Sequence, residues 1–282
     1  MARTLRTGIR AGNGLTARRA FDTVGPFVTI GLLLIAWELA ARLGTPMIIA
    51  TTVVIAFLLP PLSVVVTRIA TDFASGQLPM DIAITLYRTL AAFALATVCG
   101  VTIGLLISRN ASIRWFFDPL VSIGLPMPKI ALLPVFMLWF GLFDLSKILM
   151  VAFSASFQII IATWSATQAI EKELIWSAQS LGASRRDILR EVILPAAMPQ
   201  ILTGLQIAMP ICLIVVLITE MIMGGQGLGD SMLRSARYVD SPGVFAGIVE
   251  IGIVGFCVIR AMEFIRRRLL VWHQETRSET TV

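Results

Sequence analysis

Long apolar runs separated by short polar segments dominate the chain. A membrane-spanning helix needs about 20 mostly apolar residues, because lipid offers no partner to backbone N–H and C=O groups. Runs of this kind lie at 26–41, 81–108, 116–143, 146–169, 196–224 and 244–264. The pattern predicts an all-α, polytopic membrane protein with about six transmembrane helices.

Prolines distinguish the third of these runs. Pro126, Pro128 and Pro134 each lack an amide hydrogen and disturb a regular helix. Backbone groups freed in this way are tolerated at membrane depth only where they are buried in protein or line a cavity. The third span is therefore predicted to be kinked, either because it lines a solute pathway or because helix packing requires the bend.

Two shorter segments lie between the first and second spans. The apolar run 47–59 would give a helix of only about 20 Å before Pro60 and Pro61 end it, so it is predicted to be re-entrant, interfacial or periplasmic. Segment 62–73 carries Arg68 and Asp72 and is predicted to form a short helix at the membrane surface.

Composition supports a membrane protein and predicts its orientation. Apolar residues make up 57% of the 282 residues and charged residues 14%, against about 25% charged in an average soluble domain. Fifteen of the 23 Lys and Arg residues lie in the segments 3–19, 109–114, 172–190 and 266–277. Positively charged segments stay in the cytoplasm, which predicts cytoplasmic termini.

The basic start also fits a cleaved signal peptide, but five further spans follow it. No basic patch is interleaved with aromatic residues, so no nucleic-acid partner is expected.

Residues for metal or nucleophilic chemistry are scarce. Cys99, Cys212 and Cys257 lie in apolar runs without a CxxC spacing, and His273 is the only histidine. We therefore expect no disulfide framework, no metal site, no cofactor bound by this chain and no enzymatic activity.

The polar segment 170–195, with the sequence IEKELIWSAQSLGASRRDILREVILP, is predicted to form two short helices around a turn. Gly182 suits the left-handed residue that ends the first helix. Ser184 can cap the second helix, and Asp187 completes a capping box with Asp in place of Glu or Gln. Pro195 is predicted to break this second helix just before the fifth span. The expected product is a rigid protrusion at the cytoplasmic face.

This segment resembles the signature loop of ABC importer permeases, which is written EAA, three residues, Gly, nine residues, Ile-x-Leu-Pro. Ala178, Gly182, Leu194 and Pro195 match the signature, Ser177 is small like the usual Ala, and Trp176 replaces the usual Glu. Matches to the nitrate, sulfonate and taurine branch of these permeases include Asp118-Pro119, the run from Pro126 to Pro134, Leu138 to Gly141, Ser146-Lys147, Thr203 to Leu205, Glu220 and Gly227 to Gly229. The sequence is thus similar to this branch from about residue 37 to 272.

The resemblance implies a fold, partners and a location. The fold is that of a type I ABC importer permease, with a permease domain at 25–270 and a coupling loop at 170–195 that docks on an ATPase subunit. Residues implied in docking are Glu173, Trp176, Ser177, Ala178, Leu181, Gly182, Ala183, Ser184, Leu194 and Pro195. Implied partners are two ABC ATPase subunits, a periplasmic substrate-binding protein and a second permease copy, in a bacterial inner membrane. The chain has no GxxxxGK[ST] phosphate loop, so ATP and Mg²⁺ would be used by the partner ATPase.

Charged residues inside the apolar runs are candidates for the translocation pathway. Arg88 and Lys129 are costly in hydrocarbon and suit an anionic substrate, although pairing with an acid or snorkelling to an interface explains them equally well. Glu220 precedes the glycine-rich series 224–229, which forms either a ligand-binding backbone or a turn. With Pro126, Pro128 and Pro134 these residues form the predicted pathway set.

The resemblance implies a small anion such as nitrate, a sulfonate or taurine as substrate, with an aromatic acid or a pyrimidine vitamin precursor as the alternative. A secondary transporter would instead show inverted halves with paired broken helices. An intramembrane enzyme would need a catalytic constellation at membrane depth. Only one broken span is evident in the sequence, which favours the importer.

Overall fold

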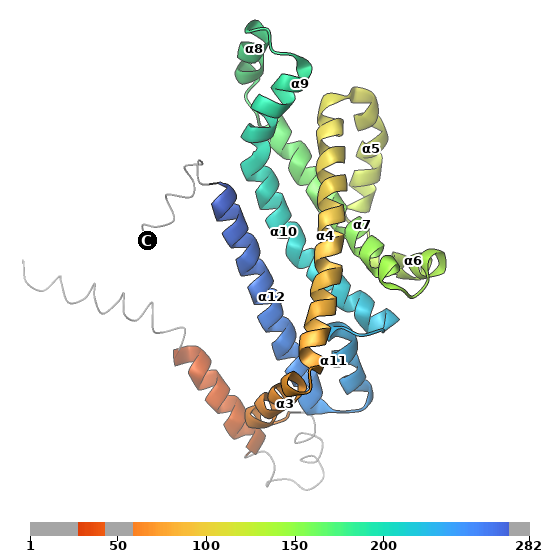
Figure 1. Ribbon diagram of the computed structural model, residues 1–282, viewed down its shortest axis with the longest axis vertical. Helices are drawn as coiled ribbons and strands as arrows, with labels where there is room; N and C mark the ends of the chain where they lie inside the picture. Colours follow the sequence, from red (N-terminus) through yellow and green to blue (C-terminus); the bar gives the residue numbers. More distant parts are fainter. Residues whose placement is uncertain (1–27, 43–58, 271–282) are drawn as a thin grey trace, which may run out of the picture.

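The computed structural model describes residues 28–42 and 59–270 (Figure 1). The predicted tails 1–24 and 271–282 and nearly all of segment 47–59 lie outside the described residues. All regular elements of the described part are helical. Besides the helix at 28–42, they are α3 (Leu62–Ala74), α4 (Gln77–Arg109), α5 (Ala111–Gly124), η1 (Lys129–Leu132), α6 (Leu133–Phe140), α7 (Asp144–Gln168), α8 (Lys172–Ser180), α9 (Arg185–Asp187), η2 (Ile188–Ile193), α10 (Leu194–Met223), α11 (Leu228–Arg237) and α12 (Ser241–Leu269).

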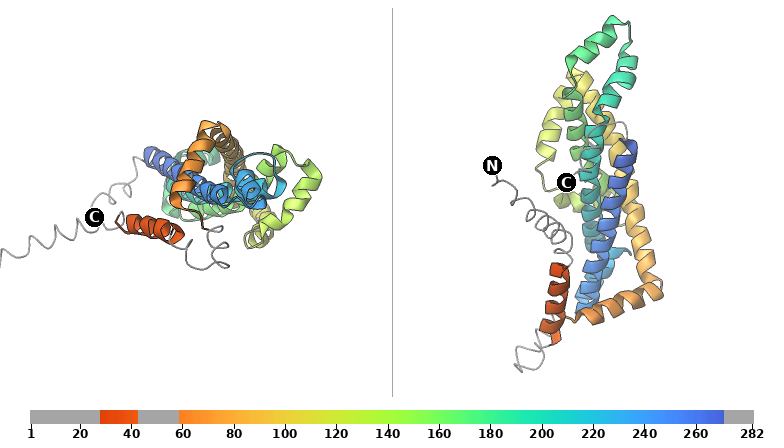
Figure 2. Two further views of the ribbon diagram at one scale, coloured as in Figure 1. Left: turned by 90° about the horizontal axis from the view of Figure 1, so that it is seen from below. Right: turned by 90° about the vertical axis from the view of Figure 1, so that its left-hand side faces the viewer.

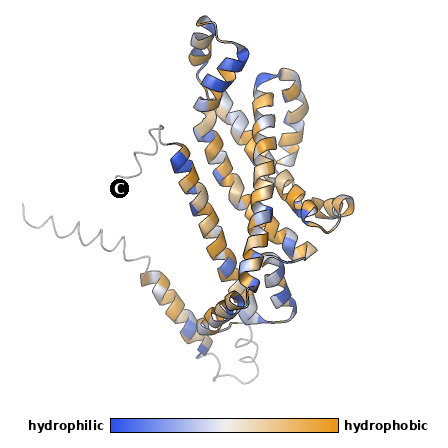
Figure 3. Ribbon diagram, in the orientation of Figure 1, coloured by the Kyte–Doolittle hydropathy of each residue, from blue (hydrophilic) through white to orange (hydrophobic). Residues whose placement is uncertain are grey.

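Four long helices form the body of the bundle. In the described part, α4, α7, the continuous helix Arg185–Met223 and α12 are each long and apolar enough to cross a membrane. They run side by side along the long axis, with apolar residues along their length and polar residues gathered towards both ends (Figures 1 and 3). The all-α membrane architecture expected from the sequence is therefore confirmed.

The third predicted span is a broken pair of helices. Ala111–Gly124 and Lys129–Phe140 are bent relative to each other by 101°, and α6 projects sideways from the bundle (Figure 1). Pro126 and Pro128 lie in the break itself, whereas Pro134 lies in the first turn of α6, where a missing N–H costs little. The bend thus follows the first two prolines.

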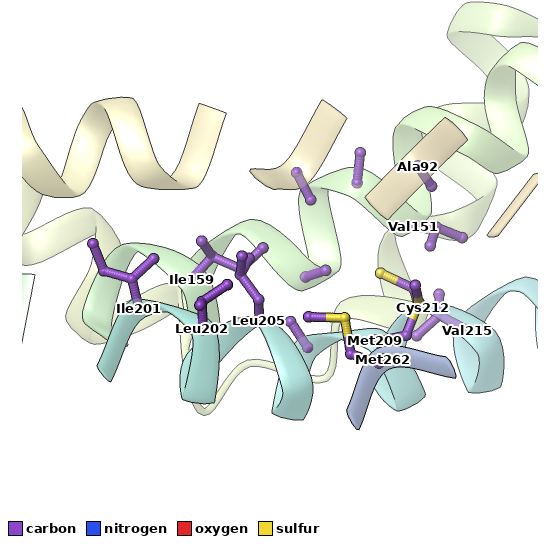
Figure 4. Close-up of a cluster of buried hydrophobic side chains, with 14 of the residues drawn as sticks. Ala92, Val151, Ile159, Ile201, Leu202, Leu205, Met209, Cys212, Val215 and Met262 are labelled. Atoms are coloured by element: carbon purple, nitrogen blue, oxygen red, sulfur yellow. The ribbon is translucent and has the colours of Figure 1, made fainter. Parts of the chain in front are cut away.

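Helix α7 lies between α4 and α10, and small residues permit this close packing. A Cβ built at Gly100 would lie 2.7 Å from Cβ of Ile159, and one built at Gly104 would lie 2.7 Å from Cβ of Thr163. The main hydrophobic core lies between α4, α7, α10 and α12 (Figure 4). Its buried residues include Ala92, Ala96, Ala155, Ala208, Cys212 and Met262. The small residues of the second span therefore serve contact within the bundle.

Helix α3 crosses the end of the bundle opposite α8 and α9, nearly perpendicular to the long helices (Figure 2). Arg68 on α3 holds Asp240 at the start of α12, with Nη1 2.7 Å from Oδ2. The helix at 28–42 joins the same end, since the Trp37 indole donates a hydrogen bond to the Pro60 carbonyl at 3.2 Å. This end is fixed by polar contacts between segments far apart in sequence.

One local prediction is wrong. Pro195 does not break the second helix of the 170–195 loop, because helical structure continues from Arg185 to Met223. Residues Ile188–Ile193 form a π-helical segment directly before the proline. In a regular α-helix the Pro195 ring would clash with the Glu191 carbonyl, and the wider π-helical turns change that register. The loop is consequently joined to the fifth span by continuous helix.

Candidate functional site

The 170–195 loop projects beyond the end of the bundle (Figure 1). Its first helix, α8, ends in a Schellman motif, in which Gly182 N–H donates to the Gln179 carbonyl at 3.0 Å and Ala183 N–H to the Ala178 carbonyl at 3.1 Å. Gly182 has φ +82°, a conformation that glycine adopts without steric cost. The predicted turn residue therefore ends α8 as expected.

A capping box begins the second helix of the loop. The Asp187 amide donates to Ser184 Oγ at 3.3 Å, and the Ser184 amide donates to Asp187 Oδ2 at 3.0 Å. Hydrogen bonding to the Ser184 side chain, and then to its backbone N–H, lowers the pKa of the Asp187 carboxyl. Because both sides of the turn at 181–184 are closed by hydrogen bonds, the two helices hold a defined relative position.

Apolar side chains cover the tip of this loop. Leu181 is 86% exposed and Trp176 57% exposed. Glu173, Ser177, Gly182, Ser184 and Pro195 are also exposed, while Ala178, Ala183 and Leu194 are half-buried. A rigid protrusion that presents a large aromatic and a leucine to the outside is typical of a surface for another protein.

A second cluster, the buried polar cluster, lies between α4, α7, α10 and the segment 224–229. Arg88 is 2% exposed and Glu220 fully buried, and Nη1 of Arg88 lies 2.7 Å from Oε1 of Glu220. Arg88 also binds Oδ1 of Asp144 through Nη2 at 2.7 Å and Nε at 2.9 Å. Two further hydrogen bonds run from Arg88 to the carbonyls of Gln226 and Gly225. In this structure Arg88 is thus paired with acidic residues, which is one of the alternatives that the sequence left open for this charge.

Glu220 completes the cluster by binding the backbone of the following segment. Its Oε2 accepts the Gly229 amide at 3.1 Å, and the Thr85 hydroxyl lies 3.0 Å from the same oxygen. Thr85 Oγ1 in turn accepts the Leu228 amide, and Oδ1 of Asp81 accepts the Gly227 amide, each at 3.0 Å. The glycine-rich series is therefore a turn whose backbone groups are bound by α4 and α10.

Lys147 belongs to the same cluster. It is 1% exposed, and its Nζ donates to the Gly224 carbonyl. Asp81, Thr85, Asp144 and Lys147 are not among the site residues predicted from the sequence. Charged residues at the ends of apolar runs were the available signal, but only the fold shows that three spans bring them to one place.

Lys129 lies apart from this cluster. It lines a cavity of about 440 Å³ with Leu125, Met127, Ile130, Ser154, Gln158, Ile211 and Val215, from the α5–η1 segment, α7 and α10. Its Nζ donates to the Leu125 carbonyl at 3.0 Å and lies 5.5 Å from the centre of the Phe157 ring. Among the lining residues there is no carboxylate, so this cation lacks a counter-ion in the cavity. A role of Arg88, Glu220, Lys129 or the three prolines in translocation stays a prediction.

Comparison with known proteins gives a consistent result. Residues 96–271 match the family model described as "Binding-protein-dependent transport system inner membrane component". The taurine transport system permease protein TauC of Escherichia coli is 30% identical over 252 residues, which cover 88% of this chain and 89% of that protein. The formylaminopyrimidine transport permease protein ThiX of Halalkalibacterium halodurans is 29% identical, over 92% of this chain and 99% of that protein.

Solved structures show the same fold. A chain of a bacterial ABC transporter involved in the import of the acidic polysaccharide alginate superposes with a TM-score of 0.58 at 17% identity. The match covers 90% of this chain and 99% of that one. The likeness therefore extends over nearly the whole chain.

Proposed function

Because the chain belongs to the family of binding-protein-dependent transport system inner membrane components, we propose that it forms the translocation pathway for a small anion in an ATP-driven importer. The substrate is nitrate, a sulfonate or taurine, taken from a periplasmic binding protein. Two copies of the chain pair in a bacterial inner membrane with both termini in the cytoplasm. The chain itself is not catalytic, and separate ATPase subunits use ATP and Mg²⁺.

The observation that carries this proposal is the construction of the 170–195 loop. Its tip exposes Trp176 and Leu181, its turn is closed by hydrogen bonds on both sides, and helix continues from Arg185 into the fifth span. A displacement of the tip by an ATPase would therefore reach α10 as a rigid-body movement. The Trp176 indole gives apolar contact area where the signature of the family has a carboxylate.

The substrate assignment rests on the Lys129 cavity and on the taurine permease relative. A cation whose cavity is lined by no carboxylate favours an anion, since a charge at membrane depth is costly without a counter-ion. The Ser154 and Gln158 side chains add polar groups to the same wall. The relative that transports formylaminopyrimidine supports a second candidate, a pyrimidine vitamin precursor.

The coupling assignment is tested by replacing Gly182 with Val and measuring co-purification of the ATPase and ATP-dependent uptake in vesicles. Valine at φ +82° is strained, so the turn should distort and ATPase retention and uptake should both fall. Gly252→Val is the matched control, because that glycine has an ordinary φ and open space around its Cβ position. Normal uptake by Gly182→Val, with normal membrane insertion, would refute the docking role of this loop.

A further inference from the structure

A basic cleft separates the coupling loop from the turn between α4 and α5. Its volume is about 720 Å³. One wall holds Arg109 at the end of α4, and the other holds Arg185 and Arg186 of α9. The elements that contribute these residues meet at the end of the bundle from which α8 and α9 project (Figure 1).

Among the described residues, the three arginines of the cleft have no acidic partner. None of them appears in an ion pair within the part of the chain that the structure describes, and no Asp or Glu lines the cleft. The nearest acid in sequence, Asp187, is engaged with the Ser184 amide. Three guanidinium groups that share one cleft repel one another, so an anion between the walls would be stabilised.

The guanidinium groups determine which kind of anion the cleft can bind. Their planar donor pairs match the oxygens of a phosphate group in a bidentate manner. The side chains of Ser108 and Gln179 supply additional hydrogen-bonding groups, and Ile113, Ile175 and Ile193 form an apolar part of the lining. A ligand with a phosphate and an adjoining apolar portion satisfies both parts of this cleft.

We propose that the cleft binds the phosphate headgroup of an anionic phospholipid from the leaflet on the loop side of the membrane. Helix α4 is long and apolar enough to span the membrane and ends at Arg109. The proposed membrane placement therefore puts Arg109 at the level of the headgroups, where basic pockets between helices suit anionic lipids. The bound headgroup bridges the coupling loop and the α4–α5 turn, and so restrains the loop relative to the spans. The inference uses the proposed membrane placement of the loop and is independent of the transported substrate.

The test measures lipid binding to the purified full-length chain by native mass spectrometry, with phosphatidylglycerol titrated against phosphatidylcholine after delipidation. The cleft variant is Arg109→Gln with Arg185→Gln, which removes one arginine from each wall. The control is Arg190→Gln with Arg268→Gln, which removes the same charge from residues outside the lining. The cleft variant lacks two of the guanidinium groups that would contact the phosphate directly, so it should bind phosphatidylglycerol at least roughly ten-fold more weakly. The control should bind like the wild type.

A second arm identifies the source of the phosphate. Inorganic phosphate and pyrophosphate are titrated at constant ionic strength, with protection against thermal unfolding as the readout. Protection that depends on Arg109 and Arg185, without selective retention of phosphatidylglycerol, would overturn the lipid assignment in favour of a soluble phosphate compound. Equal affinities in wild type, cleft variant and control would overturn the site itself.

If the double variant does not fold, the single variants Arg109→Gln and Arg185→Gln are compared with Arg190→Gln. Failure of lipid binding would leave the Gly182→Val test of the importer function unaffected.

Discussion

The Glu220 carboxylate occupies the space where a side chain at Gly227 would begin. A Cβ built at Gly227 would lie 2.4 Å from Oε1 of Glu220, and the glycine has φ +111°. Because Glu220 is fully buried and bound to Arg88, it has no room to withdraw. This relationship ties the turn at 224–229 to the end of the fifth span.

Gly227→Ala should destabilise the protein more than a loss of backbone freedom alone explains. With φ +111° and ψ 166°, Gly227 lies in a backbone region that is essentially open only to glycine, where another residue costs about 1–3 kcal/mol. Overpacking against the carboxylate adds about 1–3 kcal/mol. Gly224→Ala is the matched control, because Gly224 has a similar extended backbone with φ +69° and ψ −161° and only ordinary van der Waals contact at its Cβ position. Thermal unfolding in detergent should show the larger loss for Gly227→Ala, and equal losses would contradict the steric argument.

Arg88→Met should be strongly destabilising because it leaves Glu220 buried without its cation. Removing one partner of a buried pair costs about 3–5 kcal/mol. The double variant Arg88→Met with Glu220→Gln should recover part of this loss, since the uncompensated charge is then absent. Denaturant titration in mixed micelles gives the four free energies of the double-mutant cycle. Additive losses would mean that the two residues act independently.

The Ser184–Asp187 capping box predicts a pH-dependent loop. The Asp187 pKa is lowered in the folded loop by hydrogen bonding to Ser184. The contribution of Asp187 is therefore fully present above its unfolded pKa of about 3.9 and is lost as pH falls through the folded pKa. Hydrogen exchange of the 184–188 amides, corrected for intrinsic rates, should accelerate below about pH 4. Asp187→Asn should exchange faster already at neutral pH, whereas Ser184→Thr should stay close to wild type.

Lys129→Met should impair the uptake of an anion selectively. Hydrogen bonds to charged groups are worth about 1.5–3 kcal/mol, so loss of the ammonium predicts roughly 10- to 100-fold weaker transport at limiting concentration. Lys129→Arg should retain part of the activity. Met127→Leu changes the same cavity without changing its charge and should transport normally. Unchanged sulfonate uptake by Lys129→Met would exclude Lys129 from substrate recognition. Unchanged uptake of a formylaminopyrimidine by the same variant would fit a neutral substrate.

Features that depend on residues close together in the sequence were predictable. Apolar length identified the four long helices α4, α7, α10 and α12, and Pro126 with Pro128 identified the broken third span. Gly182 identified the end of α8, and the Ser184–Asp187 spacing identified the start of α9. Each of these depends on residues within a few positions of one another, where backbone sterics, capping and transfer into lipid dominate. Pro195 is the exception, because the π-helical segment before it lets the helix continue past a proline that the local rule treats as a helix end.

The tertiary structure alone decided which charges meet. Arg88 and Glu220 are 132 positions apart and form one ion pair, while Lys129 lines a cavity without an acid. The sequence placed all three in the same class, because cost in hydrocarbon depends on residue type and depth. Partnership depends on how α4, α7 and α10 pack, which small residues such as Gly100 and Gly104 permit. The apolar sequence thus determined that these helices lie in a membrane, and close helix packing determined which polar groups neutralise one another.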